Sequence, residues 1–104
     1  MSDAVTLREA GDEDLDAVLA IEQAGFDNPW PREAFEDELR IPFSRLVVAE
    51  GADGALLGFV DTWVVEDELH LMVIAVDPAR RRGGLGRRLL DEAERDGVAR
   101  GARY

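Results

Sequence analysis

Hydrophobic and polar positions in the first part of the chain predict one strand followed by two short helices. Residues 5–8 alternate as in a short strand. A capping signal and an acidic first turn precede apolar positions at helical spacing, which predicts an amphipathic helix over residues 12–24. Two prolines cannot lie inside a helix, so we expect a break over residues 26–31 and a second helix from Pro31 to about Leu39.

The rest of the chain predicts three strands and a final helix. Residues 44–50 and 55–65 each have the pattern of a strand, and the Gly-Ala-Asp-Gly turn between them predicts a hairpin. Residues 69–76 form the most apolar strand and lack clean alternation, which predicts burial on both faces. An apolar stripe predicts a helix over residues 85–100, with Gly101 as its C-terminal cap. The expected order is β-α-α-β-β-β-α, a mixed α/β (α+β) fold.

Composition limits the chemistry that this fold can carry. The chain has 104 residues, enough for one domain over residues 1–104. It has no cysteine, which excludes disulfides and iron–sulfur clusters, and a single histidine, His70, cannot build a multi-histidine metal site. All 12 cationic residues are arginine, so a Walker-type phosphate loop and lysine chemistry are excluded. No apolar run approaches the ~20 residues of a membrane helix, and the N-terminus lacks a basic start, so we expect a soluble cytoplasmic protein.

Charge is unevenly distributed along the chain. Residues 1–77 contain four arginines against 19 acidic residues, whereas residues 78–104 contain eight arginines against four acidic residues. The acidic body argues against a nucleic-acid partner, whose binding needs a basic surface. Five arginines nevertheless fall within residues 80–88, around three glycines. This combination predicts a local site for a polyanionic small molecule.

The loop before the last helix is the most informative segment. A strand leads through a glycine- and arginine-rich loop into a helix N-terminus, where free backbone N–H groups and the helix dipole attract anions. Gly84 and Gly86 lack a Cβ atom, which allows a pyrophosphate to approach the backbone. A dinucleotide-binding fingerprint would need glycine where Leu89 stands. A turn with solvated arginines ahead of an ordinary helix is the plainer alternative.

At this loop the sequence resembles a known family. Residues 81–86, Arg-Arg-Gly-Gly-Leu-Gly, match the acyl-CoA loop R/Q-x-x-G-x-G/A of the GNAT acetyltransferases, and they follow a strand that ends in Ile-Ala-Val-Asp-Pro. The segment Phe-Asp-Asn-Pro-Trp at residues 26–30 resembles the RimI branch, the N-terminal protein acetyltransferases that modify ribosomal proteins. The resemblance implies a mainly antiparallel GNAT sheet and an acetyl-CoA-dependent N-acetyltransferase. Its acceptor would be an amine, foremost the N-terminal alanine of a ribosomal protein.

The resemblance also implies roles for individual residues. The residues that it assigns to acetyl-CoA are Ile74, Ala75, Val76, Arg81, Arg82, Gly83, Gly84, Leu85, Gly86 and Arg87. His70 lies where some members carry the catalytic base, and an imidazole can exchange a proton near neutral pH. The alternative for His70 is a packed or solvated strand residue, and Glu68 is a weaker candidate base. Phe26 and Trp30 would line the acceptor cleft, with packing of the first two helices onto the sheet as the equal alternative.

Acidic residues near the two predicted helices allow a further role. Glu22, Asp27 and residues 36–38 would attract a basic peptide N-terminus, although a run of charges is usually a solvated face. A catalytically inactive acyl-CoA-binding or interaction module derived from the same fold is the alternative function, and a scaffold without a ligand is the third.

The resemblance does not extend over a whole GNAT domain. The family continues into further strands that carry a catalytic Glu, a Tyr that protonates the thiolate and an Asn beside CoA. No residue here takes those roles, and Tyr104 lies too early in the pattern to be that acid. Without the further strands, the strand over residues 69–76 would present an apolar edge. We therefore expect a possible homodimer or strand swap through this edge.

Overall fold

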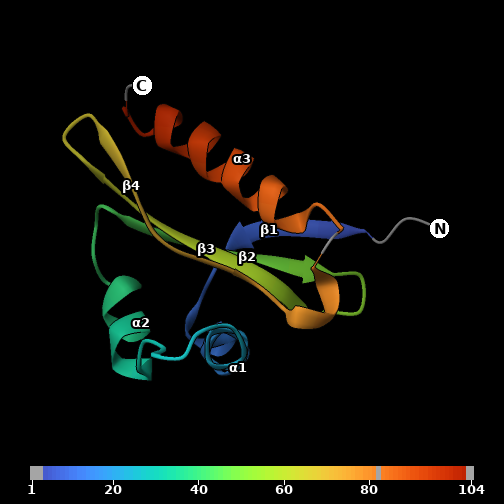
Figure 1. The fold of residues 1–104 in the computed structure, drawn as a ribbon. Helices are drawn as coiled ribbons and strands as arrows, with labels where there is room; N and C mark the ends of the chain where they lie inside the picture. The colour runs from blue at the N-terminus through green and yellow to red at the C-terminus, as the bar shows by residue number, and fades with distance from the viewer. Residues whose placement is uncertain (1–3, 82, 103–104) are drawn as a thin grey trace.

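The helices and strands follow the predicted order in the computed structural model, which describes residues 4–81 and 83–102 (Figure 1). The elements are β1 (Val5–Glu9), α1 (Leu15–Gly25), α2 (Arg32–Glu38), β2 (Ser44–Gly51), β3 (Leu56–Val65), β4 (Glu68–Val76) and α3 (Leu85–Ala99). Two short 3₁₀ turns, Asp12–Asp14 and Pro78–Arg80, precede α1 and α3. The first was included in the predicted helix, and the second was not predicted.

The four strands form one antiparallel sheet in the order β1-β2-β3-β4. Helices α1 and α2 cover one face of this sheet, and α3 covers the other (Figure 1). Phe35 of α2 and Phe59 of β3 meet edge to face in the first layer, at 5.7 Å between ring centroids. Leu89 of α3 packs with Val60 of β3 in the second layer. The predicted mixed fold with a mainly antiparallel sheet is confirmed.

β4 lies at the edge of the sheet, and its predicted burial on both faces is wrong. Ala75 is the one buried residue of this strand, and the Leu71 side chain is 49% exposed. The apolar composition misled the prediction because β4 has a strand neighbour only on the β3 side, among the residues that the structure describes. A long apolar edge of this kind is open to pairing with another chain.

A β-bulge interrupts the pairing of β3 with β4. Asp61 pairs with Val73, whereas the next residue, Thr62, pairs with Leu71, so Met72 is the extra residue on β4. Bulges bend a strand and redirect its side chains, and they are frequent beside active sites. The bulge separates the half of β4 that leads into the arginine-rich loop from the half that carries His70.

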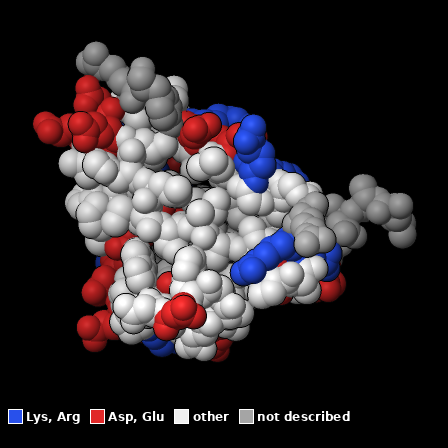
Figure 2. All heavy atoms as spheres, viewed as in Figure 1, with Lys and Arg blue, Asp and Glu red and all other residues white. Residues whose placement is uncertain are grey.

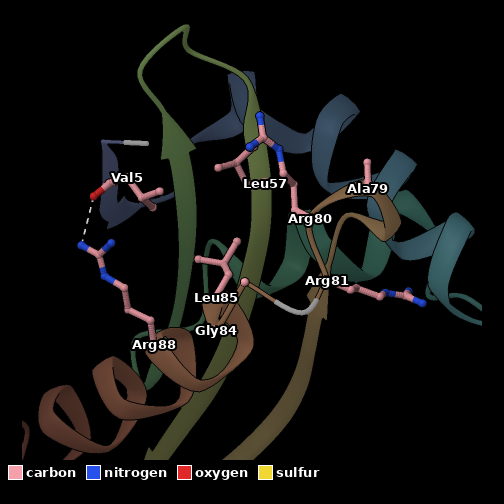
Figure 3. A pocket seen from close by; sticks show the side chains of 9 residues that line it. Val5, Leu57, Ala79, Arg80, Arg81, Gly84, Leu85 and Arg88 are labelled. Atoms are coloured by element: carbon pink, nitrogen blue, oxygen red, sulfur yellow. Dashed lines mark hydrogen bonds between the residues drawn. The ribbon is translucent and has the colours of Figure 1, made fainter. Parts of the chain in front are cut away.

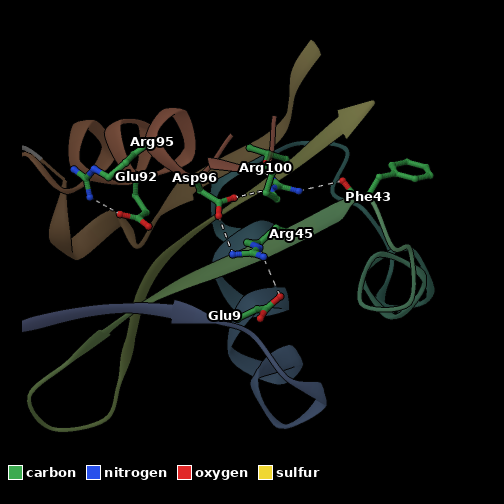
Figure 4. A network of polar contacts seen from close by, with 8 residues as sticks. Glu9, Phe43, Arg45, Glu92, Arg95, Asp96 and Arg100 are labelled. Atoms are coloured by element: carbon green, nitrogen blue, oxygen red, sulfur yellow. Dashed lines mark hydrogen bonds and ion pairs between the residues drawn. The ribbon is translucent and has the colours of Figure 1, made fainter. Parts of the chain in front are cut away.

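The C-terminal part of α3 is joined to the sheet by a polar network (Figure 4). Asp96 accepts hydrogen bonds from Arg45 Nη1 of β2 and from Arg100 Nε, each at 2.8 Å. Arg100 also donates to Thr62 Oγ1 of β3 at 2.8 Å.

The helix α3 ends as predicted, because Gly101 has a φ of +108° and its N–H donates to the carbonyl of Val98, a geometry that favours glycine. No helix within residues 4–81 and 83–102 is long and apolar enough to cross a membrane.

Candidate functional site

The loop between β4 and α3 is shaped by its own side chains and by one glycine. The Asp77 carboxylate accepts a hydrogen bond from the backbone N–H of Ala79 at 3.0 Å, and this bond holds the 3₁₀ turn Pro78–Arg80. Gly84 then precedes α3 with a φ of +82°, in the left-handed region that side chains disfavour. The loop therefore turns sharply and presents the first N–H groups of α3 outward.

A hollow of about 420 Å³ opens beside this loop (Figure 3). Its apolar wall comes from Val5, Leu57 and Leu85, and arginine side chains flank it. Arg88 Nη2 donates to the backbone carbonyl of Val5 at 3.0 Å, which ties the start of α3 to β1. Arg82, which was assigned to the cofactor from the sequence, lies outside the described residues.

A second hollow, of about 370 Å³, lies along the edge of β4, and its wall is mainly apolar. The residues that line it are Gly25, Phe26, Ile74, Ala75, Val76, Arg81 and Gly86. Three elements thus meet there: the end of α1, the outer edge of β4 and the start of α3. Arg81 lines both hollows, and its Nε lies 3.4 Å from the backbone carbonyl oxygen of Val76. In Figure 3 its side chain points away from the first hollow.

The electrostatics of this region favour an anionic ligand. The first N–H groups of a helix have no partner within the helix, and the helix dipole adds a positive potential there. Arg80, Arg81, Arg87 and Arg88 are all exposed and lie within this loop and the first turn of α3. On the face shown in Figure 2, acidic side chains gather along the left edge, whereas the arginines lie mainly toward the right. The loop can hold a polyphosphate, and the edge of β4 can pair with an extended chain.

Phe26, Trp30 and His70, which were predicted to act on the acceptor, lie in three different surroundings. Phe26 is 41% exposed and lines the second hollow. Trp30 is half-buried, and its ring lies 5.3 Å from the ring of Phe35, which agrees with the packing alternative. His70 lies on the far side of the bulge, exposed, with its Nε2 atom 3.3 Å from Glu68 Oε1. It is not among the residues that line either hollow, and its catalytic role stays a prediction.

Two glutamates that were expected to attract a basic peptide are buried, so this expectation is wrong for them. Glu22 of α1 is 2% exposed, and its Oε2 accepts a hydrogen bond from the backbone N–H of Trp30 at 2.9 Å. This bond fixes the segment that joins α1 to α2. Glu38 is buried at the end of α2, whereas Asp27 and Asp37 are exposed. The burial of both glutamates could have been predicted from the sequence. Glu22 follows Val18 by four residues and Glu38 follows Phe35 by three, and these spacings place each glutamate on the buried face of its helix.

Glu38 belongs to a polar cluster that sequence reasoning missed. Its Oε1 accepts hydrogen bonds from Trp63 Nε1 at 2.7 Å and from Ser44 Oγ at 2.9 Å. Ser44 Oγ also lies 3.0 Å from Oδ1 of Asp61, a fully buried residue of β3. Burial, and then the neighbouring Glu38 carboxylate, raise the pKa of Asp61 to about 9. Burial alone would raise the pKa of Glu38 as well, but its polar interactions with Asp61, Trp63 and Ser44 outweigh burial and lower that pKa.

Comparison with known proteins gives one family over most of the chain. Residues 15–104 match the acetyltransferase (GNAT) family. The [ribosomal protein bS18]-alanine N-acetyltransferase of Escherichia coli is 39% identical over 90 residues, which cover 83% of this chain and 60% of that protein.

Solved structures show the same fold. The crystal structure of the ribosomal-protein-S18-alanine N-acetyltransferase from Escherichia coli matches with a TM-score of 0.85 and 32% identity, over 95% of this chain and 63% of that one. The aminoglycoside N-acetyltransferase AAC(6′)-Iy in complex with CoA matches with a TM-score of 0.83 and 21% identity, over 99% of this chain and 75% of that one. The chain therefore spans less than two thirds of the Escherichia coli proteins that it matches.

Proposed function

This chain belongs to the GNAT acetyltransferase family, and from that premise we propose that it binds acetyl-CoA and transfers the acetyl group directly to an amine. The observation that carries the proposal is the second hollow, which joins the outer edge of β4 to the N-terminus of α3. A ligand with an extended amide arm and a pyrophosphate needs both features next to each other. The predicted cofactor loop and the predicted β4 edge residues meet there.

The residues of this chain fit the parts of acetyl-CoA. The backbone N–H groups around Gly84, Leu85 and Gly86 would hold the pyrophosphate, with the exposed arginines at the rim. Ile74, Ala75 and Val76 would pair with the pantetheine arm, as a sheet edge pairs with a further strand. A backbone N–H near Ile74 would stabilise the developing oxyanion. When bound, acetyl-CoA supplies the activated thioester.

The acceptor amine must lose a proton before it attacks. Its nitrogen then bonds to the acetyl carbon while the carbon–sulfur bond breaks, a second proton leaves as the amide forms, and the CoA thiolate takes up one proton. We keep His70 as the candidate for the first proton transfer, because it is the single histidine of the chain and its imidazole is exposed to solvent. His70 lies four residues before Ile74 along β4, so more than one water molecule would have to link it to an amine at the second hollow.

A polypeptide N-terminus is the acceptor that we favour. The support is the name of the Escherichia coli relative, which acts on an alanine of a ribosomal protein. Phe26, which lines the second hollow just after α1, would contact such an acceptor. An enzyme for a ribosomal protein would work in the cytoplasm.

The edge of β4 before the bulge at Met72 supports a second copy of the chain as a partner, because the half after the bulge is assigned to the pantetheine arm. Leu71 is exposed there, and no strand within residues 4–81 and 83–102 pairs with that edge. Light scattering at micromolar concentration would give twice the mass of the chain. A monomer would contradict this part of the proposal.

Calorimetric titration with acetyl-CoA, followed by an assay of thiol release with a peptide amine, tests the main proposal. Binding with thiol release supports an acetyltransferase. Binding without release for any of several amines supports the alternative, an inactive acyl-CoA-binding module. If acetyl-CoA does not bind, the proposal is wrong for this chain.

A further inference from the structure

Two carboxyl groups meet at one hydroxyl where α2 packs on the sheet. Glu38 is the last residue of α2, Ser44 the first of β2, and Asp61 lies in the middle of β3. Asp61 is fully buried and Glu38 nearly so. The Ser44 Oγ atom lies within hydrogen-bond distance of both carboxyl groups, at 2.9 Å from Glu38 Oε1 and 3.0 Å from Asp61 Oδ1.

The number of donor hydrogens in this cluster indicates which carboxyl group is protonated. Glu38 Oε1 accepts from Trp63 Nε1, which can only donate. The Ser44 hydroxyl has one hydrogen and can donate it to only one of the two carboxyl groups. If it donates to Glu38, the contact with Asp61 needs a hydrogen on Asp61. The remaining oxygen, Asp61 Oδ2, is buried and has no hydrogen-bond partner among the described residues, which makes a charge there costly.

We propose that Glu38 and Asp61 hold a single proton between them through Ser44 near neutral pH, and that this proton fastens the end of α2 to the sheet. Asp61 is then the neutral member and Glu38 the charged one. The raised pKa of Asp61 and the lowered pKa of Glu38 agree with this assignment. Loss of the proton at alkaline pH would set two negative charges around one hydroxyl and weaken the attachment of α2.

Few other charged groups reach the cluster. Arg100, at the end of α3, donates to Thr62 next to Asp61, and its positive charge opposes the rise in the Asp61 pKa. β4 contributes the apolar Val73 opposite Asp61. His70 is the cross-strand neighbour of Trp63, but its side chain is exposed. The Glu38 carboxylate is therefore the main charge that Asp61 faces.

The cluster bears on the acceptor side of the proposed enzyme, and this step rests on the proposed function. α2 continues the segment that begins at Phe26 and is held by Glu22 at Trp30. Asp61 pairs with Val73, next to the bulge at Met72. Loosening α2 would disturb the acceptor segment while leaving the loop around Gly84 intact. Asp61 would thus be a positioning residue for the acceptor.

A titration of the carboxyl carbons by ¹³C NMR tests the shared proton without any activity. We expect the Asp61 carboxyl of the 104-residue chain to change its shift well above pH 7. The Glu38→Gln variant keeps an oxygen that accepts from Trp63 and Ser44 but removes the charge, so the Asp61 midpoint should move to lower pH. Titration of Asp61 below pH 5 in the unmodified chain would overturn the proposal.

Unfolding experiments give an independent readout. In the folded chain Asp61 keeps a proton that the unfolded chain releases near pH 4, so this group raises the unfolding constant by up to about tenfold per pH unit between pH 5 and 8. Asp61→Asn, which imitates the neutral form, should remove this rise and be more stable than the unmodified chain at pH 8. Asp37→Asn, an exposed neighbour in α2, is the control and should keep the rise. If Asp61→Asn is instead less stable at pH 8, the charged form of Asp61 is the native one and the proposal is wrong.

Enzyme kinetics test only the proposed role of Asp61 in positioning the acceptor. Raising the pH toward 10 should increase KM for a peptide amine several-fold in the unmodified chain and not in Asp61→Asn, with the Kd for acetyl-CoA unchanged in both. The same increase in KM in both proteins would show that Asp61 does not position the acceptor. Absence of any turnover would count against the proposed function, and the NMR and unfolding results would still decide the shared proton.

Discussion

The side chain of Leu69 lies directly against Gly97, with its methyl carbons 3.0 Å from the place that a Cβ atom at residue 97 would occupy. This contact explains why glycine stands inside α3, where it costs about 1 kcal/mol of helix propensity relative to alanine. Glycine allows the helix to approach β4 closely at this level.

We therefore expect Gly97→Ala to lower the free energy of unfolding, although alanine is the better helix former. Crowding of a packed site typically costs 1–3 kcal/mol, and the gain in propensity offsets about 1 kcal/mol of it. Urea unfolding of Gly97→Ala, Leu69→Ala and the double variant would measure the coupling. In the double variant the alanine at residue 97 should no longer destabilise, and an unchanged penalty would show that the contact is not its cause.

Acid should weaken the attachment of β1 to the turn before α1. Arg8 donates from both terminal nitrogens to the two Asp14 oxygens, each at 2.9 Å, and these bonds hold the pKa of Asp14 below its ordinary value. Because the folded pKa lies below the unfolded pKa, the stabilisation is present above about pH 4 and is lost as the pH falls through the folded pKa. Asp14→Asn should cost about 1–3 kcal/mol at pH 7. Its stability should also depend less on pH between 5 and 2 in chemical unfolding, and an unchanged acid profile would contradict the assignment.

A negative charge at Gly84 should abolish acetyl-CoA binding. Aspartate and asparagine have the same shape and both tolerate the left-handed conformation of this residue better than other side chains do. Gly84→Asp should therefore lose affinity by 100-fold or more because it repels the pyrophosphate, whereas Gly84→Asn should lose far less. Calorimetry on the two variants makes the comparison. Equal losses would mean that the space at residue 84, and not its charge, matters.

Removal of the imidazole should slow turnover without affecting the cofactor. General-base catalysis typically contributes 10²–10⁴-fold, so His70→Gln should lower kcat by about that factor while the Kd for acetyl-CoA stays the same. Glu68→Gln tests the weaker candidate base in the same assay, because Glu68 lies 3.3 Å from the imidazole and is exposed as well. Full activity of His70→Gln would remove His70 from the mechanism.

Local patterns in the sequence predicted most of the fold and the position of the glycine-rich loop before α3. Turn residues and helical spacing placed every strand and α-helix in order, and the Gly84 loop follows β4 as expected. The predictions that failed depend on residues that are distant in the sequence but adjacent in the fold. The exposure of β4 follows from its place at the sheet edge, and the burial of Asp61 beside Glu38 follows from α2 packing over β3. An acidic residue on a strand gives no sign of a second acid 23 positions earlier in the chain.

The hydrogen bond from the Trp30 backbone to the buried Glu22 carboxylate has a consequence for selectivity. A segment held this way loses its conformational freedom when the chain folds, so an incoming acceptor does not have to order it. In the proposed enzyme, acceptors that match its shape would then bind without an entropic penalty from this segment. Acceptors of another shape would be disfavoured, because accommodating them would break a hydrogen bond to a buried carboxyl group. The bond between Glu22 and Trp30 would thus favour a narrow range of acceptors over a broad one.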